Sequence, residues 1–188
     1  MIKSRDDLKC YLEADGRNYW HIKSSWIKRM YAHLFTDSIN DQTKIWSYIY
    51  NLRHLEYHIN NKGIINKIGY IYYAHKVRQL SRITGFQISP NTCGKGLTIW
   101  HFGTIIVNAN AKIGDYATFP PPLTIGHTEN GGVPVIGDHV TINGGASVVG
   151  EIEIGDNVII APNAAVVKSV PSNVVVGGIP AKIIKEIS

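Results

Sequence analysis

Two spacings of hydrophobic residues divide the chain. Over roughly the first 85 residues, apolar side chains recur at intervals of three and four, which is the pattern of one face of an α-helix. After Gly85 the interval changes to six, and polar or glycine-containing stretches fill the spaces between the apolar positions. This change predicts an N-terminal helical region, residues 1–85, followed by a region of short strands, residues 86–188.

The helical region is predicted to contain three helices. Ser4 and Asp7 are spaced as in a capping box and predict a helix start, and Gly16 can end that helix. A second helix is expected over residues 45–63 and a third over residues 65–84. The third is rich in tyrosine and basic residues, and two interpretations of it stay open. It is either a helix that lies on a membrane surface or an aromatic core helix whose basic side chains face solvent.

The second region repeats an aliphatic or aromatic residue every six positions. A period of six fits neither an α-helix nor a hairpin, and it indicates short strands joined by tight turns, stacked in coils around a central column. Eleven residues rather than twelve separate Ile125 from Ile136, so HTENGGVP, residues 127–134, is expected to leave the coil as a loop. The repeating positions are Val107, Ile113, Phe119, Ile125, Ile136, Ile142, Val148, Ile154, Ile160 and Val166.

Two local stretches of this region are distinctive. TIWHFGTIIVNANAKIGDY, residues 98–116, is rich in β-branched residues and is therefore expected to be strand, with His101 placed within it. Residues 120–122 are three consecutive prolines, which lack the N–H groups of a strand ladder, so an irregular coil is expected there.

Four pieces of the repeat region resemble the hexapeptide-repeat acyltransferases, and among them the serine acetyltransferase family. The resemblance covers residues 86–185, through HFGTIIVNANAKIGD, LTIGHT, INGGASVVGEIEIGDNVIIAPNAAVVKSVP and GGIPAKII. It implies an α+β chain, in which the helical region precedes a left-handed parallel β-helix. It also implies acetyl-CoA as co-substrate, no metal, and a homotrimer, and it leaves open whether two trimers pair.

The resemblance places the catalytic residues around His101. In the family, a histidine ahead of a strand of the form I-V-V is the general base, and His101 precedes the matching strand here. The implied reaction is direct transfer, in which His101 takes the proton of an acceptor hydroxyl that attacks the thioester. Gln87 stands where the family has an aspartate that orients this histidine, and a neighbouring subunit is the alternative source of that group. His127 is a second candidate, and Gly126 lies near the expected oxyanion site.

The departures from the family concern the acceptor. Gln87 replaces an aspartate, Trp100 replaces the acid before the catalytic histidine, and Gly132 with Val133 replaces an Arg-His pair. The charges that would hold a serine zwitterion are therefore missing, whereas Trp100 suits the apolar face of a sugar ring. The chain is similar to the capsule- and O-antigen-modifying relatives of the family. A sugar or polysaccharide-precursor hydroxyl is the expected acceptor, with serine O-acetyltransferase as the alternative.

The resemblance also implies a groove for the pantetheine arm of the cofactor. Small residues there let a ligand approach the backbone closely, and lysines match places where the family uses cations near the phosphates of CoA. The expected cofactor-binding residues are Gly126, Gly144, Gly145, Ala146, Asn163, Ala164, Lys168 and Lys182.

Composition narrows the setting of the protein. Of the 188 residues, 44% are hydrophobic and 18% are charged, which is ordinary for a folded globular chain. Without a long apolar run or a signal-like N-terminus, and with two cysteines in no framework pattern, a cytoplasmic protein is expected. Residues 1–85 hold 14 Lys and Arg against 7 Asp and Glu, which suits an acidic substrate, a lipid head group or a solvated surface. We expect no nucleic-acid partner.

Two remote alternatives remain. The same β-helix is similar to that of the γ-class carbonic anhydrases, which bind zinc with three histidines across a trimer interface. His101, His127 and His139 are numerous enough for such a site. A non-catalytic, structural β-helix is the other alternative.

Overall fold

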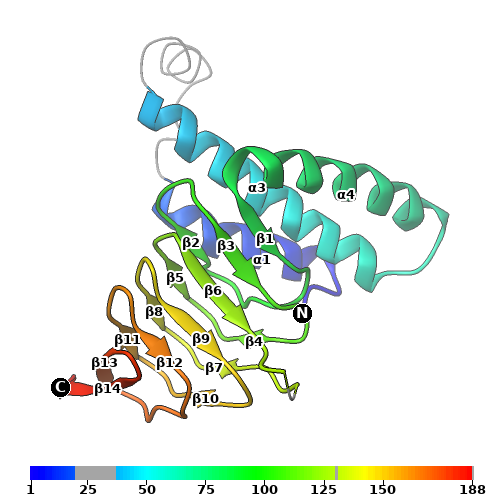
Figure 1. Ribbon diagram of the computed structural model, residues 1–188. Coiled ribbons are helices and arrows are strands. Elements are labelled where there is room, and N and C mark those ends of the chain that lie inside the picture. The colour runs from blue at the N-terminus through cyan, green and yellow to red at the C-terminus, as the bar shows by residue number, and fades with distance from the viewer. Residues whose placement is uncertain (20–36, 130, 188) are drawn as a thin grey trace.

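The computed structural model describes residues 1–19, 37–129 and 131–187. Helices come first and a parallel β-helix follows, which confirms the expected fold class (Figure 1). None of the helices in these ranges is long and apolar enough to cross a bilayer. The helices are α1 (Arg5–Asp15), the 3-10 helix η1 (Gly16–Asn18), α3 (Asp37–Asn60) and α4 (Ile64–Thr84).

The three predicted helices are present, and one of them needs a correction. The side chain of Ser4 accepts a hydrogen bond from the N–H of Asp7 at 3.0 Å, and the Asp7 carboxylate accepts one from the N–H of Ser4 at 2.9 Å, which forms the expected capping box. α4 ends at Gly85, whose φ of 84° is a left-handed cap. α3 begins at Asp37, well before residue 45, because its polar first turns carry no hydrophobic period. The division into two domains at Gly85 stays a prediction.

Three sheets form the sides of the β-helix. Sheet A is ordered β1-β3-β6-β9-β12, sheet B β4-β7-β10, and sheet C β2-β5-β8-β11-β13, with β14 added antiparallel to β13. The strands are β1 (Phe86–Ile88), β2 (Thr98–Ile99), β3 (Ile105–Val107), β4 (Lys112–Ile113), β5 (Thr118–Phe119), β6 (Leu123–Gly126), β7 (Val135–Ile136), β8 (Thr141–Ile142), β9 (Ser147–Val149), β10 (Glu153–Ile154), β11 (Ile159–Ile160), β12 (Ala165–Val166), β13 (Val174–Gly178) and β14 (Ala181–Glu186).

The chain runs from sheet A to sheet B to sheet C and back, so its turns stack into three corners. The A–B corner consists of residues 108–111, 127–129, 131–134, 150–152 and 167–169. The B–C corner consists of residues 114–117, 137–140, 155–158 and 171–173, together with residues 94–97 of the first coil. The C–A corner consists of residues 100–104, 120–122, 143–146 and 161–164.

The six-residue period is confirmed as the core of the β-helix. All ten repeating positions point inward and are at most 5% exposed. A second buried column lies two residues ahead of the first, and it includes small or β-branched side chains such as Ala117, Val140 and Val158. Two inward residues on each side of a coil fill the narrow interior, so the repeat specifies the fold by burial.

A ladder of aspartates holds the B–C corner. The N–H of Asp115 donates to Asp138 Oδ1 and the N–H of Asp138 donates to Asp156 Oδ1, both at 2.7 Å. The N–H of Lys95 donates to Asp115 Oδ1 at 3.0 Å. The residue after each of these three aspartates has a φ between 55° and 59°, which makes the turn. The recurring Ile-Gly-Asp of the sequence is therefore a corner that bonds to the coil before it.

The three prolines form one turn of the C–A corner between β5 and β6. β6 pairs with β3 over three residues, but β5 pairs with β8 only at Thr118, so the irregularity expected here is limited to the end of β5 and the proline turn. A turn needs no ladder donors, and the carbonyl of Pro122 accepts a hydrogen bond from the N–H of Gly145 at 2.6 Å.

The helices cap the first coil of the β-helix. The hydroxyl of Tyr19 donates to the carbonyl of Ile99 at 2.8 Å and accepts from its N–H at 3.0 Å. The hydroxyl of Tyr48 accepts from the N–H of Ile88 at 3.2 Å. β1 and β2 end their sheets, and in the described part of the chain no strand lies beside them on this side, so the tyrosines supply the missing partners.

Candidate active site

His101 lies in the turn between β2 and β3, at the C–A corner. The expectation that it lies within a strand is wrong, because residues 100–104 turn the chain from sheet C to sheet A. Its side chain is exposed, and no residue in the described ranges makes a hydrogen bond or an ion pair with the ring. The neighbouring Trp100 is 40% exposed. Both rings are therefore free to meet a ligand.

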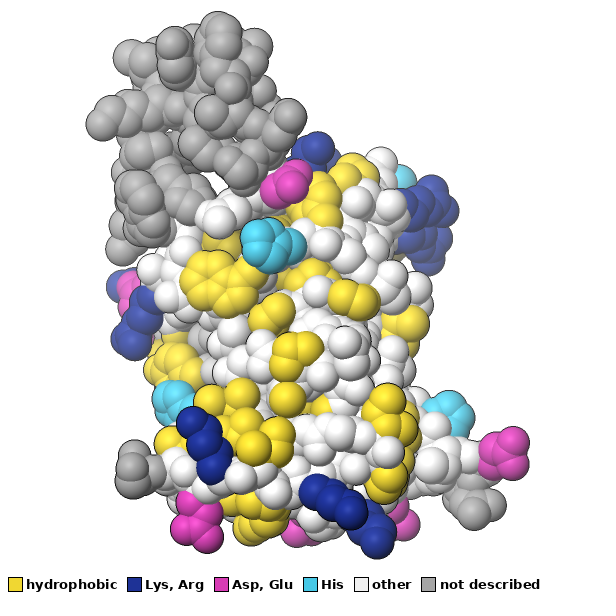
Figure 2. All heavy atoms as spheres, turned by 60° about the vertical axis from the view of Figure 1, so that its left-hand side comes forward, with side chains coloured by type: hydrophobic (Ala, Val, Ile, Leu, Met, Phe, Trp, Pro, Cys, Tyr) yellow, Lys and Arg dark blue, Asp and Glu magenta, His cyan; other side chains and the backbone are white. Residues whose placement is uncertain are grey.

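The C–A corner continues below His101 through residues expected to bind the cofactor. The prolines form the next turn, Gly144 and Gly145 the one after, and Asn163 the last. The N–H of Asn163 donates to the carbonyl of Gly144 at 3.0 Å, which ties successive turns together. Figure 2 brings this side of the molecule forward, with hydrophobic side chains spaced along the β-helix and Lys or Arg side chains at its lower end.

Glycine is required at the middle of this corner. Gly145 has a φ of 81°, and a Cβ there would lie 1.9 Å from Asn163 Oδ1. A Cβ at Gly144 would lie 3.0 Å from the carbonyl oxygen of Pro121. The corner thus presents nearly bare backbone, as the expected pantetheine groove requires.

Ala146 and Ala164 do not belong to this surface. Each is 1% exposed and points into the β-helix, two residues ahead of Val148 and Val166 in the second buried column. Their assignment to the cofactor groove is therefore corrected, because a side chain within the core cannot contact a ligand outside the coil.

His127 lies at the A–B corner, directly after β6. Its Nδ1 is 3.0 Å from Nδ2 of Asn108, and Oδ1 of Asn108 accepts the N–H of Asn110 at 3.0 Å. The second bond fixes the orientation of the amide, so Nδ2 donates to His127 and the neutral ring carries its proton on Nε2. His127 can therefore donate from Nε2. Sequence reasoning missed Asn108, and its place after the strand IIV was the available signal.

Sheet A separates His127 from His101 within one chain. β3 and β6 pair in register, with Ile105 opposite Leu123, and His101 precedes the one strand while His127 follows the other. A strand of three residues spans about 10 Å, so the two rings lie at opposite edges of the sheet. One chain does not bring them together.

The remaining candidates divide between the same two edges. Gly126 ends β6 and Lys168 follows β12, both at the A–B corner. Lys182 lies on β14 opposite Gly177, near the end of β13 that leads toward the C–A corner. Gln87 faces outward from sheet A opposite Ile106, and no hydrogen bond joins it to His101 within the described ranges. Its orienting role stays a prediction.

Gly132 is constrained by packing. It has a φ of 73°, and a Cβ there would lie 2.5 Å from Cβ of Glu151. An arginine at this position would need a shifted backbone. The loop conformation is therefore incompatible with the arginine that the family has here. Val133 is half-buried beside it. Neither Gly132 nor Val133, both among the described residues, can therefore supply a cation to bind the carboxylate of an acceptor.

The three histidines of the zinc alternative lie at three different corners of one chain. His101 is at the C–A corner, His127 at the A–B corner, and His139 at the B–C corner, where its ring stacks on Tyr116 at 4.9 Å. Within the described ranges, no three His, Cys, Asp or Glu side chains are grouped as metal ligands.

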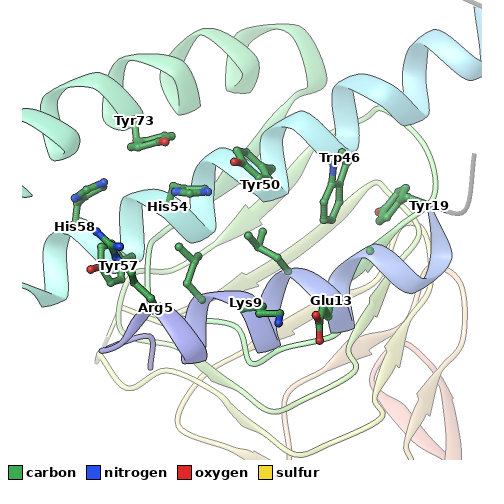
Figure 3. A pocket seen from close by; sticks show the side chains of 13 residues that line it. Arg5, Lys9, Glu13, Tyr19, Trp46, Tyr50, His54, Tyr57, His58 and Tyr73 are labelled. Atoms are coloured by element: carbon green, nitrogen blue, oxygen red, sulfur yellow. The ribbon is translucent and has the colours of Figure 1, made fainter. Parts of the chain in front are cut away.

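A hollow of about 710 Å³ lies away from these corners, between α1, α3 and α4 (Figure 3). Tyr73 stacks between His54 and His58, at 4.7 and 5.4 Å between ring centroids. Nε2 of His54 is buried and has no hydrogen-bond partner among the residues that the structure describes. None of the site residues predicted from the sequence lines this hollow. Because the candidate general base His101 lies on the β-helix, we place the candidate active site there.

Comparisons with known proteins agree with this geometry. The family model "Bacterial transferase hexapeptide (six repeats)" matches residues 134–168. A serine acetyltransferase of Staphylococcus aureus (strain Mu50 / ATCC 700699) is 42% identical over 118 residues, which are 60% of this chain and 55% of the relative. The chain therefore spans about half the length of the curated relatives it matches.

Two solved structures show the same fold. A Neisseria gonorrhoeae serine acetyltransferase in complex with serine has a TM-score of 0.66 at 26% identity, over 97% of this chain and 71% of that one. A serine acetyltransferase in complex with CoA has a TM-score of 0.66 at 22% identity, over 95% of this chain and 68% of that one. The resemblance to hexapeptide-repeat, serine acetyltransferase-like proteins is confirmed, and the closeness to sugar-modifying relatives stays a prediction.

Proposed function

We propose that this chain, a hexapeptide-repeat protein similar to serine acetyltransferases, is an acetyl-CoA-dependent O-acetyltransferase. The observation that carries the proposal is the C–A corner, where an exposed, unengaged His101 stands at one end of a run of bare backbone at Gly144 and Gly145. A general base next to a groove for the pantetheine arm is the arrangement that direct acyl transfer needs.

The reaction proceeds through a tetrahedral intermediate. His101 accepts the proton of the acceptor hydroxyl while the oxygen attacks the thioester carbonyl carbon. The oxyanion is stabilised by backbone N–H groups, for which Gly126 is the candidate. The intermediate collapses, the carbon–sulfur bond breaks, and the thiolate of CoA takes the proton from the imidazolium. The products are an acetyl ester and CoA, and His101 returns to its neutral form.

The active site is proposed to form between neighbouring subunits of a homotrimer. His101 and Lys182 lie toward one edge of sheet A, whereas His127, Gly126 and Lys168 lie at the other. A closed three-fold ring brings the C–A corner of one chain beside the A–B corner of the next, once at each interface. The orienting partner of His101 then comes from Gln87 or from the neighbouring chain.

The acceptor has two candidates, each with its own support. The comparisons favour L-serine, since the similar proteins are named serine acetyltransferases and one is in complex with serine. The residues at positions 87, 100, 132 and 133 favour a sugar hydroxyl, because they provide no charge for a zwitterion and place an exposed indole at Trp100.

An acceptor screen decides between them. Purified protein, acetyl-CoA and L-serine, free sugars or nucleotide sugars are combined, and thiol release is followed. Trp100→Ala is the matched variant. If a sugar stacks on the indole, the variant raises the KM for that sugar and leaves kcat close to wild type. Faster turnover with serine than with any sugar establishes serine O-acetyltransferase. If neither serine nor any of the sugars supports thiol release, the proposed function is contradicted.

A further inference from the structure

One side of α4 exposes an unusual amount of apolar surface. We call this the α4 outer face. Its residues recur at positions that share one side of a helix. A soluble chain seldom leaves a continuous apolar patch of this kind open to water without a binding role. The face consists of Ile64, Ile65, Ile68, Ile71 and Tyr72, which are 72%, 77%, 63%, 68% and 55% exposed.

The α4 outer face is not needed to hold α4 in place. The opposite side of the helix packs against α3, where Tyr73 stacks on His54 and His58 and where Val77 and Leu80 meet the hydrophobic core. Figure 1 shows the N-terminal half of α4 projecting away from the β-helix, together with the end of α3. The exposed face is therefore available to a partner outside the chain.

Positive charge surrounds the α4 outer face. α4 contains no aspartate or glutamate, and it carries Lys67, Lys76, Arg78 and Arg82. Within the described ranges none of these four cations forms an ion pair. The ammonium of Lys76 lies 5.7 Å from the ring of Tyr72, at the border of the face. A partner that covers this helix must therefore be apolar at its centre and anionic at its rim.

A hollow of about 850 Å³ adjoins the same face, where α3 turns into α4. Its lining combines Ile59, Ile64 and Ile71 with the cations Lys62 and Lys67. An apolar hollow flanked by two ammonium groups suits an acyl chain whose anionic head group stays at the surface.

We propose that the α4 outer face docks on the surface of an anionic lipid bilayer. The helix lies in the interface plane, with its isoleucines among the upper acyl carbons and its cations against lipid phosphates. A second copy of this chain fits less well, since pairing two such faces brings like charges together. The inference is independent of the reaction at the β-helix.

Vesicle binding by the full-length protein tests the proposal. Vesicles of phosphatidylcholine with phosphatidylglycerol are compared with pure phosphatidylcholine vesicles in a sedimentation assay at low salt. We expect binding to the anionic vesicles, with a loss at 0.5 M salt. The double variant Ile65→Asp, Ile68→Asp is expected to bind at least about tenfold more weakly. Lys67→Gln and Arg78→Gln are each expected to weaken binding about fivefold.

Ile184→Asp is the matched control, because Ile184 is as exposed as Ile68 but lies on β14, at the far end of the β-helix. It should bind like wild type. Equal binding by wild type and the double variant would overturn the proposal, as would failure of the wild type to bind anionic vesicles. Light scattering is run on every variant. If wild type does not bind and the double variant forms a smaller assembly than wild type, the face is a contact between copies.

Discussion

The guanidinium of Arg53 and the carboxylate of Asp15 form an ion pair, with 2.8 Å between Nε and Oδ2, and neither side chain is exposed to solvent. Arg53 also pairs with Glu56 at 3.0 Å and donates to the carbonyls of Cys93 and Gly94 at 2.9 and 2.6 Å. One arginine thereby joins α1, α3 and the first coil of the β-helix.

Asp15→Asn is expected to destabilise the protein by about 3 kcal/mol, because it leaves part of the buried charge of Arg53 uncompensated. The measurement is the free energy of unfolding in urea. Lys95→Ala is the control, since Lys95 and Asp115 form a half-exposed pair at 3.8 Å. Its loss should cost less than about 1 kcal/mol. Equal losses in the two variants would show that burial of the Arg53 pair is not what matters.

His101→Ala and His101→Asn are expected to lower kcat by about 10²- to 10⁴-fold, the usual effect of losing a positioned general base. Both should fold, since the ring is exposed and makes no hydrogen bond within the described ranges. Turnover is measured by thiol release, and assembly by light scattering. His139→Asn serves as control, because His139 lies at another corner and Asn tolerates its φ of 57°. Near-full turnover in a folded His101 variant would remove His101 from the mechanism.

Mixed trimers test whether the active site is shared between chains. His101→Ala and His127→Ala are expected to be far less active alone. Co-expressed with two different tags and purified through both, they should regain about a third of the wild-type sites, because one of the three interfaces in every mixed trimer receives both intact histidines. If mixed assemblies are as inactive as either parent variant, the two histidines do not act together in a site shared between neighbouring chains.

Acid should weaken the helical region through His54. Burial, and then the charge of His58, lower the pKa of His54 from its ordinary value of 6.5. The unfolded chain therefore takes up this proton at a higher pH than the folded chain. Stability falls as the pH drops from about 6.5 through the folded pKa. Thermal unfolding between pH 7.5 and 5.5 should show a smaller fall in Tm for His54→Phe than for wild type or His139→Asn. Identical slopes in all three would contradict this role.

The inward positions of the β-helix were predictable because each is a hydrophobic residue in a fixed period. A buried position requires only an apolar side chain of suitable size, and the sequence shows this directly. The capping box of Ser4 and Asp7 was equally local. His101 was misplaced into a strand because its β-branched neighbours carry the same propensity on either side of a turn. Ala146 and Ala164 were misassigned because a small residue reads alike in a groove and in a core.

Other features depend on contacts between distant parts of the sequence. The pairing of Arg53 with Glu56 is local, but it does not mark Arg53 as buried, since its other partners come from residue 15 and from the first coil. The split of the candidate residues between two corners likewise depends on how many residues each turn contains. The expected roles of Gln87 and the lysines involve a neighbouring chain or a ligand, so they stay predictions.

The number of stacked strands in sheet C sets the distance between the two ends of the β-helix. Five strand spacings separate β2, next to His101, from β14, which carries Lys182, and at about 4.8 Å each they amount to about 24 Å. That length is set by the number of coils and is insensitive to side chains on the surface. Adding or removing one whole coil would leave the remaining corners and the core intact. It would change the distance between His101 at one end and Lys182 at the other by one strand spacing, about 4.8 Å.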